Sequence, residues 1–180
     1  MEDRLDSGSS VLELGSGTGR PVAERLASRH RYLGVDVSAA MVTTARRNVR
    51  GGRFRVADMR YVDLPVGDFD AVVAFYSIIH VPRSDQPALL SRIYAWLRPG
   101  GYFVASFSSE DLAAGVDEDW LGAGPMYWSG YDAATNIRML IDAGFEVIRA
   151  EVVPQIEPDG EVRFLWCTTR RPVPQADLLR

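Results

Sequence analysis

Three glycines alternate with small polar residues between a short apolar segment and a segment with a helical pattern. Gly15, Gly17 and Gly19 directly follow Val11–Leu14 and shortly precede Pro21–Arg29. Glycine allows sharp turns and close approach of a ligand to the backbone, and a helix start offers unpaired N–H groups and a positive dipole end. A plain strand-to-helix turn needs no such alternation. The segment therefore predicts an anionic or nucleotide-like ligand at a strand–turn–helix unit.

The rest of the chain continues the alternation of strands and helices. Apolar runs predict strands at 11–14, 32–37, 54–57, 69–76 and 102–107, and a closing hairpin of 146–153 with 162–168. Helical patterns cover 21–29, 38–49, 84–97 and 132–144, with Ser38, Ser84 and Asp132 as predicted N-caps. Such alternation predicts an α/β fold with a doubly wound parallel sheet. In such a sheet ligands bind at the carboxyl ends of the strands.

Composition favours one globular domain over residues 1–180, with 1–10 as a lead-in and 171–180 as a loose tail. The hydrophobic fraction of 47% is ordinary, and the single Cys167 cannot form an internal disulfide. The net charge of −4 argues against nucleic acid as the obligate partner. No apolar run reaches the ~20 residues that span a bilayer, and the acidic start does not match a signal peptide. We therefore expect a cytoplasmic protein without a membrane segment.

The spacing of the glycines separates two kinds of nucleotide-like ligand. A dinucleotide fingerprint is G-x-G-x-x-G, whereas here the third glycine comes one residue early and Arg20 follows it. The G-x-G-x-G form, preceded by the acidic Glu13, resembles motif I of the class I S-adenosylmethionine-dependent methyltransferases. Asp36, at the end of the second predicted strand, does not discriminate, because its spacing also suits NAD.

The resemblance extends along most of the chain. Ala57-Asp58-Met59 follows the third predicted strand, 69–73 resembles the fourth-strand motif, and 97–101 resembles the turn before the fifth strand. These motifs occur in the family's order and are followed by the terminal hairpin. The resemblance implies a Rossmann-like, doubly wound, seven-stranded sheet, mostly parallel, in which an antiparallel strand is inserted near the edge.

S-adenosylmethionine is the cofactor that the resemblance implies, with S-adenosylhomocysteine as its product. Asp36 would accept from the ribose hydroxyls and Asp58 from the adenine amino group, while Val37 and Met41 would pack on the adenine. No metal is expected. The expected cofactor-binding residues are Glu13, Gly15, Ser16, Gly17, Gly19, Arg20, Asp36, Val37, Met41, Asp58, Met59 and Phe75.

His80 is the candidate catalytic base, because an unperturbed imidazole titrates near neutrality (~6.5). A purely structural role in its loop is the alternative. Tyr76 and Ser77 precede it and are candidate substrate-binding residues. Family members that methylate exocyclic amines of nucleic acids carry an Asn/Asp-Pro-Pro-Tyr tetrad at this place, which 75–78 lacks.

Residues 108–131 are expected to form a long loop, and long loops are commonly lids or binding segments. Trp120, Tyr127 and Trp128 in it would wall an apolar acceptor pocket, or pack on the domain as a small satellite core. Family members commonly carry an N-terminal helical segment that covers the substrate. Here the first predicted strand begins near residue 11, so we expect an acceptor site that is either open, covered by 108–131, or covered by a partner subunit.

The function predicted from these residues is methyl transfer from S-adenosylmethionine to an oxygen or nitrogen atom of a small-molecule acceptor. Two alternatives stay open: methylation of a protein or RNA, and a non-catalytic S-adenosylmethionine-binding module. A nicotinamide oxidoreductase is disfavoured by the glycine spacing. A homodimer stays open beside a monomer.

Overall fold

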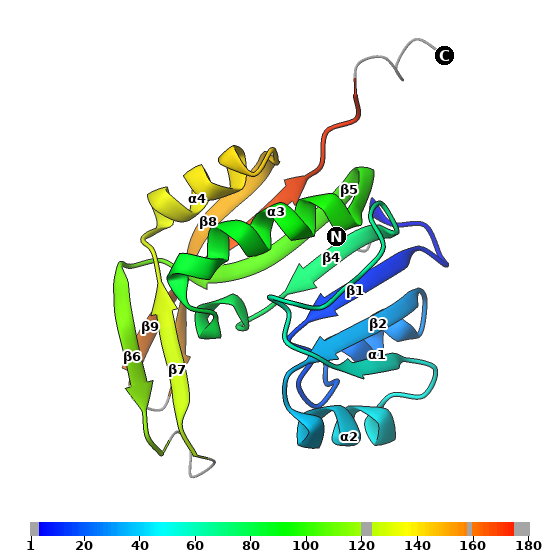
Figure 1. Cartoon of the computed structure of the whole chain (residues 1–180), viewed down its shortest axis with the longest axis horizontal. Coiled ribbons are helices and arrows are strands. Elements are labelled where there is room, and N and C mark those ends of the chain that lie inside the picture. The colour runs from blue at the N-terminus through cyan, green and yellow to red at the C-terminus, as the bar shows by residue number, and fades with distance from the viewer. Residues whose placement is uncertain (1–3, 120–123, 158–159, 175–180) are drawn as a thin grey trace.

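The centre of the molecule is a seven-stranded sheet with the strand order β3-β2-β1-β4-β5-β9-β8 (Figure 1). The computed structural model describes residues 4–119, 124–157 and 160–174, and strands are counted within these ranges. The strands of the sheet are β1 (Ser10–Leu14), β2 (Arg31–Asp36), β3 (Arg53–Val56), β4 (Phe69–Ala74), β5 (Leu97–Ser108), β8 (Glu146–Glu157) and β9 (Gly160–Arg170). Neighbours among β1 to β5 are parallel, and β9 runs antiparallel between β5 and β8. The predicted α/β fold with its C-terminal antiparallel hairpin is confirmed.

Four helices cover the two faces of the sheet: α1 (Val22–Ala27), α2 (Ala39–Asn48), α3 (Gln86–Trp96) and α4 (Ala133–Asp142). Side chains alternate along β1 because successive residues of a strand point to opposite faces. Val11 packs in a core with residues of α1 and α2, whereas Leu12 and Leu14 pack in a core with residues of α3 and α4. All three side chains are fully buried, as expected for a central strand covered on both faces.

Two of the three predicted N-caps are confirmed. Ser38 Oγ accepts from Met41 N at 3.3 Å, and Asp132 Oδ1 accepts from Thr135 N at 2.9 Å. The prediction for Ser84 is wrong. A one-turn helix η3 (Arg83–Asp85) precedes α3, and the Ser84 hydroxyl donates to Asp85 instead of capping the helix.

Residues 108–131 do not form the predicted long loop. They contain β6 (Leu112–Asp117) and β7 (Met126–Gly130), which pair as a small antiparallel sheet (Figure 1), and β7 contacts β5 and the turn after β4. The sequence pattern does not predict this pairing, because every side chain of β6 is exposed and the strand lacks the apolar alternation of a half-buried strand. Trp120 lies outside the described residues.

The parallel strands end at one edge of the sheet, where the turn after β1 and the turn after β4 lie next to each other. The turn after β4 continues into the short helix η2 (Ile78–His80). This edge therefore holds the residues that the sequence singled out. Within the described ranges, no helix combines the length and the apolar composition needed to cross a membrane.

Candidate active site

The three glycines of the turn after β1 meet three different environments. All have left-handed backbones, with φ values of 78° for Gly15, 50° for Gly17 and 80° for Gly19. A Cβ on Gly15 would lie 2.3 Å from Ser77 Cβ, and one on Gly19 would lie 2.8 Å from Val49 Cγ2. A Cβ on Gly17 would meet no atom within 4 Å. Packing thus requires the outer two glycines, whereas Gly17 faces open space in which a ligand can approach the backbone.

Asp36 fixes the shape of this turn from the end of β2. Its Oδ2 accepts from Gly17 N at 2.8 Å, and its Oδ1 accepts from Ser38 N at 2.9 Å. A carboxylate oxygen can accept two hydrogen bonds, so each oxygen keeps capacity for a ligand hydroxyl. The arrangement suits the predicted ribose contact.

Glu13 lies beneath the turn and is only 4% exposed. Its carboxylate accepts a hydrogen bond from the Tyr32 hydroxyl. Burial raises the pKa of Glu13 to about 7, with the Tyr32 hydrogen bond opposing the rise and the charge of Asp36 adding to it. The carboxyl group of Glu13 thus has its hydrogen-bond partner inside the protein and is not accessible to a ligand.

Ser16 and Arg20 lie in the same turn but differ in burial and in pairing. The Ser16 hydroxyl is buried and has no hydrogen-bond partner among the described residues. A buried polar group without a partner is costly, so a ligand that supplies polar atoms beside it would stabilise the turn. Arg20 is exposed and pairs with Glu24 at 3.5 Å.

Exposed apolar side chains lie near the end of β2. Val37 is 72% exposed and Met41 43% exposed, values that a bound ring would lower. Such exposure of large apolar side chains fits the predicted adenine contact. Met59, after β3, packs against the core and is partly buried.

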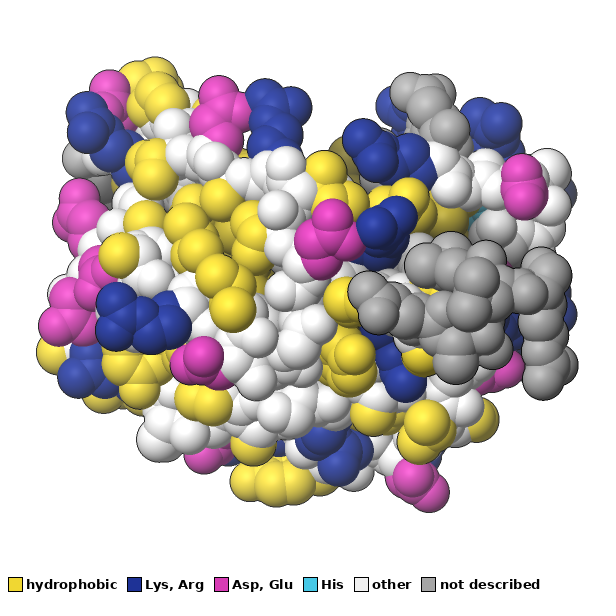
Figure 2. All heavy atoms as spheres, turned by 90° about the horizontal axis from the view of Figure 1, so that it is seen from above, with side chains coloured by type: hydrophobic (Ala, Val, Ile, Leu, Met, Phe, Trp, Pro, Cys, Tyr) yellow, Lys and Arg dark blue, Asp and Glu magenta, His cyan; other side chains and the backbone are white. Residues whose placement is uncertain are grey.

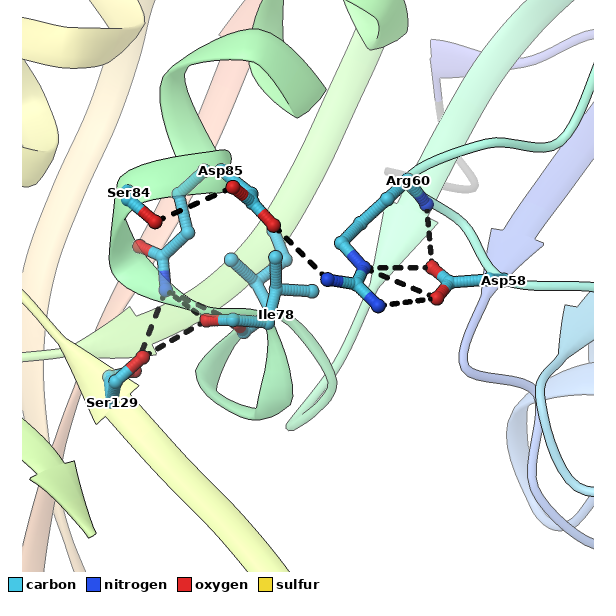
Figure 3. Close-up of polar contacts among 8 residues, drawn as sticks. Asp58, Arg60, Ile78, Ser84, Asp85 and Ser129 are labelled. Atoms are coloured by element: carbon cyan, nitrogen blue, oxygen red, sulfur yellow. Dashed lines mark hydrogen bonds and ion pairs between the residues drawn. The ribbon is translucent and has the colours of Figure 1, made fainter.

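Asp58 is held by Arg60, a residue that the sequence analysis missed. Arg60 Nη2 donates to Asp58 Oδ2 at 2.7 Å, and its Nε lies 3.1 Å from both oxygens (Figure 3). Arg60 Nη1 also donates to Asp85 Oδ2 at 3.0 Å. These hydrogen bonds hold the pKa of Asp58 below its usual value. The bridge orients Asp58 as an ionised acceptor and ties its loop to η3.

A cavity of about 650 Å³ opens beside the turn after β4. Its ring-bearing and apolar lining comes from this turn, from β6, from β7 and from β9. This lining is formed by Tyr76, Ile79, His80, Leu112, Trp128, Val162 and Phe164. Phe164 was not predicted, because only the pairing of β9 with β5 brings it to this edge.

His80 has a fixed tautomer. Its Nδ1 lies 2.8 Å from the carbonyl oxygen of Tyr127. A carbonyl can only accept, so Nδ1 carries the proton and Nε2 keeps its lone pair. The ring packs on Trp128 with a centroid distance of 4.4 Å. Burial lowers the pKa of His80, and the hydrogen bond to Tyr127 only partly offsets that effect. His80 is therefore neutral at neutral pH, as a base must be.

Gln86 anchors the segment that carries His80. It is only 2% exposed, and its Nε2 donates to Ile78 O at 3.2 Å and to Val81 O at 3.0 Å. Ser129 Oγ of β7 also donates to Val81 O at 3.0 Å (Figure 3). Helix η2 is thus fastened to both α3 and β7, which keeps the imidazole in one place.

Tyr76 lines the cavity in a strained backbone conformation. Its φ of 52° is left-handed, which is uncommon for a residue with a side chain and is often found at functional sites. Its hydroxyl donates to Gln155 Oε1 at 2.7 Å, and its ring stands edge-on to Phe164. Tyr76 therefore closes one wall of the cavity.

The remaining candidates take other positions. Ser77 is buried and donates from Oγ to Leu14 O at 2.7 Å, so it joins the turn after β4 to the end of β1 rather than lining the cavity. Tyr127 contributes its backbone carbonyl to His80. Phe75 packs on Trp166 with a centroid distance of 5.4 Å. Among the described residues, no group of three or more His, Cys, Asp and Glu side chains is placed to hold a metal ion.

Comparisons with known proteins place the chain in a family. The family described as "Methyltransferase domain" matches residues 11–101, about half of the chain. Phosphoethanolamine N-methyltransferase 1 of Triticum aestivum is 31% identical over 165 residues, which cover 83% of this chain and 31% of that protein. The arsenite methyltransferase of Aquipseudomonas alcaligenes is 27% identical over 92% of this chain and 55% of its own length. The chain thus spans only part of these curated relatives.

The fold is also that of solved methyltransferases. A SAM-dependent methyltransferase from Methanosarcina mazei matches with a TM-score of 0.83 at 14% identity, covering 96% of this chain and 97% of that one. The family match, the order of the motifs and the inserted antiparallel strand β9 agree with one another. The chain belongs to the class I S-adenosylmethionine-dependent methyltransferase family.

Proposed function

We propose that this chain transfers the methyl group of S-adenosylmethionine to an oxygen or nitrogen atom of a small molecule. The observation that carries the proposal is the position of His80. This neutral imidazole, fixed by the carbonyl of Tyr127, lies on a cavity of about 650 Å³ at the carboxyl end of the sheet. Ser77, three residues before it, contacts Gly15 of the glycine turn. Acceptor cavity and glycine turn are therefore neighbours.

The residues around the glycine turn fit the cofactor. Gly17 faces open space, Asp36 keeps acceptor capacity, Asp58 is held as an ionised acceptor, and Val37 and Met41 expose apolar surface. We assign the ribose to Asp36, the adenine amino group to Asp58 and the adenine ring to Val37 and Met41. We assign no direct cofactor contact to Glu13, whose carboxylate is bound by Tyr32.

The chemistry divides between positioning and proton transfer. When bound, the cofactor supplies a sulfonium-activated methyl group. The cavity walls hold the acceptor in line with it, and such positioning contributes roughly 7–11 kcal/mol to lowering a barrier. His80 Nε2 accepts the proton that an acceptor hydroxyl or ammonium must lose, a contribution of about 10²–10⁴-fold. Positioning is the larger effect.

A small acceptor is supported by the size of the cavity and by the relatives. A volume of about 650 Å³ is within the ~300–1,000 Å³ of small-molecule sites. The relatives named above act, by their names, on phosphoethanolamine and on arsenite, both small molecules. Tyr76, Trp128 and Phe164 give this cavity aromatic walls, which suit an acceptor with an apolar body.

Calorimetry with S-adenosylhomocysteine, followed by turnover with a library of small acceptors, tests the proposal. We expect binding of S-adenosylhomocysteine, no binding of NAD, and release of S-adenosylhomocysteine only when an acceptor is present. Binding of S-adenosylhomocysteine with turnover only on protein or RNA would reject the small acceptor. Binding without turnover on any acceptor would make the chain a binding module.

A further inference from the structure

The walls of the acceptor cavity carry more negative than positive charge. Three of its lining residues are carboxylates, Glu110, Asp111 and Glu161, and one is a guanidinium, Arg163. Seen from above, the left side of the molecule carries acidic and basic side chains together, so the excess of carboxylates is a property of the cavity lining (Figure 2). With His80 neutral, the lining therefore favours a cation over an anion.

The basic groups near the cavity are already engaged. Arg163 Nε donates to Glu161 Oε1 at 2.9 Å. Arg83, on η3, pairs with Asp111 at 2.5 Å and lies over the ring of Tyr131. Each of these guanidinium charges is thus already balanced by a carboxylate, which weakens its attraction for a phosphate or carboxylate group of an acceptor.

Glu110, unlike these arginines, has no charged partner in the described part of the chain. In the described part of the chain its carboxylate joins no ion pair and accepts no hydrogen bond, and it lines the cavity. It is therefore the carboxylate available to a bound cation. Asp111 and Glu161 add to the negative potential although each has an arginine partner.

Aromatic rings in the lining give a second, independent reason for a cation. Tyr76, Trp128 and Phe164 wall the same cavity. Ring faces attract an ammonium group within about 6 Å of the centroid, and an apolar body packs on the same rings. Rings and a free carboxylate together form an environment for an amine with an apolar body.

We propose that the acceptor is a protonated amine attached to a small apolar body, with no phosphate or carboxylate group. This inference rests on the proposed methyl transfer and names its substrate class. The ammonium gives one proton to Nε2 of His80, which becomes an imidazolium. The freed nitrogen lone pair forms the bond to the methyl carbon while the carbon–sulfur bond breaks and its electron pair stays on sulfur. The methylated ammonium that results keeps its charge beside Glu110, and the imidazolium returns its proton to water.

Three probes with the same phenyl body test the sign of the charge: phenethylamine as the cation, 2-phenylethanol as the neutral analogue and phenylacetate as the anion. Binding to the whole chain is measured by calorimetry, with and without S-adenosylhomocysteine. We expect phenethylamine to bind about tenfold tighter than 2-phenylethanol and phenylacetate to bind weakest, because rings and carboxylates act together on the cation.

Glu110→Gln removes the free carboxylate with little change in size, and we expect it to reduce the preference for the cation about threefold or more. Glu146→Gln is the matched control, because Glu146 pairs with Arg170 at the other end of β8 and is not a lining residue. We expect this control to keep the wild-type preference. An unchanged preference in Glu110→Gln would overturn the role of Glu110.

The outcomes separate the two proposals. Equal or tighter binding of the alcohol or the acid, or no binding of any probe, would overturn the amine inference and leave methyl transfer standing. Failure of S-adenosylhomocysteine to bind would overturn the proposed function, while the preference measured without it would still decide the charge of the ligand.

Discussion

The carbonyl oxygen of Tyr127 lies 2.8 Å from Nδ1 of His80 and so determines which nitrogen of that imidazole is basic. Tyr127 belongs to β7, a strand of the small second sheet, whereas His80 belongs to the turn after β4 of the main sheet. The imidazole and the carbonyl group that orients it therefore come from separate sheets.

Replacement of His80 by Ala should reduce turnover much more than cofactor affinity. A general base contributes about 10²–10⁴-fold, and His80 is the group in the described cavity lining with a free ring lone pair. We expect kcat to fall at least about 10²-fold, with S-adenosylhomocysteine affinity within twofold of wild type by calorimetry. Equal losses in both would return His80 to a structural role.

The pH dependence of kcat should carry the signature of His80. Burial lowers its pKa below the ordinary value of 6.5, so the base form predominates at neutral pH and is lost as the pH falls through the lowered value. We expect kcat to fall on the acid side of pH 6.5. Glu13, with a pKa raised to about 7, titrates in the same range, so a His80→Asn variant separates the two groups. The residual activity of this variant should lose the acid limb, and a limb that persists would assign it to Glu13 and contradict the role of His80.

The lowered pKa of His80 also predicts a pH dependence of the free energy of unfolding. The unfolded state binds the His80 proton more readily than the folded state, so the contribution of His80 to the free energy of unfolding is largest above pH 6.5 and decreases as the pH falls from there. The raised pKa of Glu13 contributes in the opposite direction in both proteins, so the difference between wild type and His80→Asn isolates the contribution of His80. Urea unfolding at several pH values measures it, and identical slopes in both proteins would show that His80 is not buried as described.

Gly17→Val should abolish cofactor binding while the protein stays folded. A Cβ at this position would meet no atom within 4 Å, so the new side chain would project into the space assigned to the ligand. The matched control is Gly51→Val, because Gly51 also has a left-handed backbone, with φ of 86°, and also meets no atom within 4 Å. Both variants should lose about 1–2 kcal/mol of stability from backbone strain. Only Gly17→Val should lose S-adenosylhomocysteine binding in calorimetry, and loss in both would implicate strain instead of the site.

Gly15→Ala should act on stability first. Its Cβ would lie 2.3 Å from Ser77 Cβ, which requires the turn after β1 and the turn after β4 to separate. Overpacking of this kind costs about 1–3 kcal/mol, added to the strain of a left-handed alanine. Thermal unfolding measures it, and a melting temperature equal to wild type would show that the two turns are not in contact.

Asp36→Ala should weaken cofactor binding by about 1.5–3 kcal/mol, the scale of hydrogen bonds to a charged group. It also leaves Gly17 N and Ser38 N without their acceptor. Calorimetry therefore needs a melting curve beside it. An unchanged affinity for S-adenosylhomocysteine in a folded variant would remove Asp36 from the site.

Local patterns predicted the main sheet because each of its strands and caps is a local feature. Val11–Leu14, Ser38 and Asp132 needed only their neighbours in the chain to be recognised. Ser84 was assigned wrongly because the short turn η3 places Asp85, not Ser84, at the start of α3.

The acceptor side could be predicted only in part. His80, Tyr76 and Trp128 follow recognisable signals, an imidazole and rings near the end of a strand. Phe164 and Glu110 reach the cavity through the pairing of β9 with β5 and the position of the segment before β6, which no short sequence pattern records. The bridge from Arg60 to Asp85 spans 25 positions and is a tertiary contact of the same kind.

The most direct measurement is transfer of a deuterated methyl group from labelled S-adenosylmethionine, followed by mass spectrometry of an acceptor library that contains matched amines, alcohols and acids. The wild-type chain should add one labelled methyl group to an amine and release one equivalent of S-adenosylhomocysteine, while the His80→Ala variant should show little transfer at the same cofactor occupancy. Full cofactor occupancy without label on any small molecule would contradict the account.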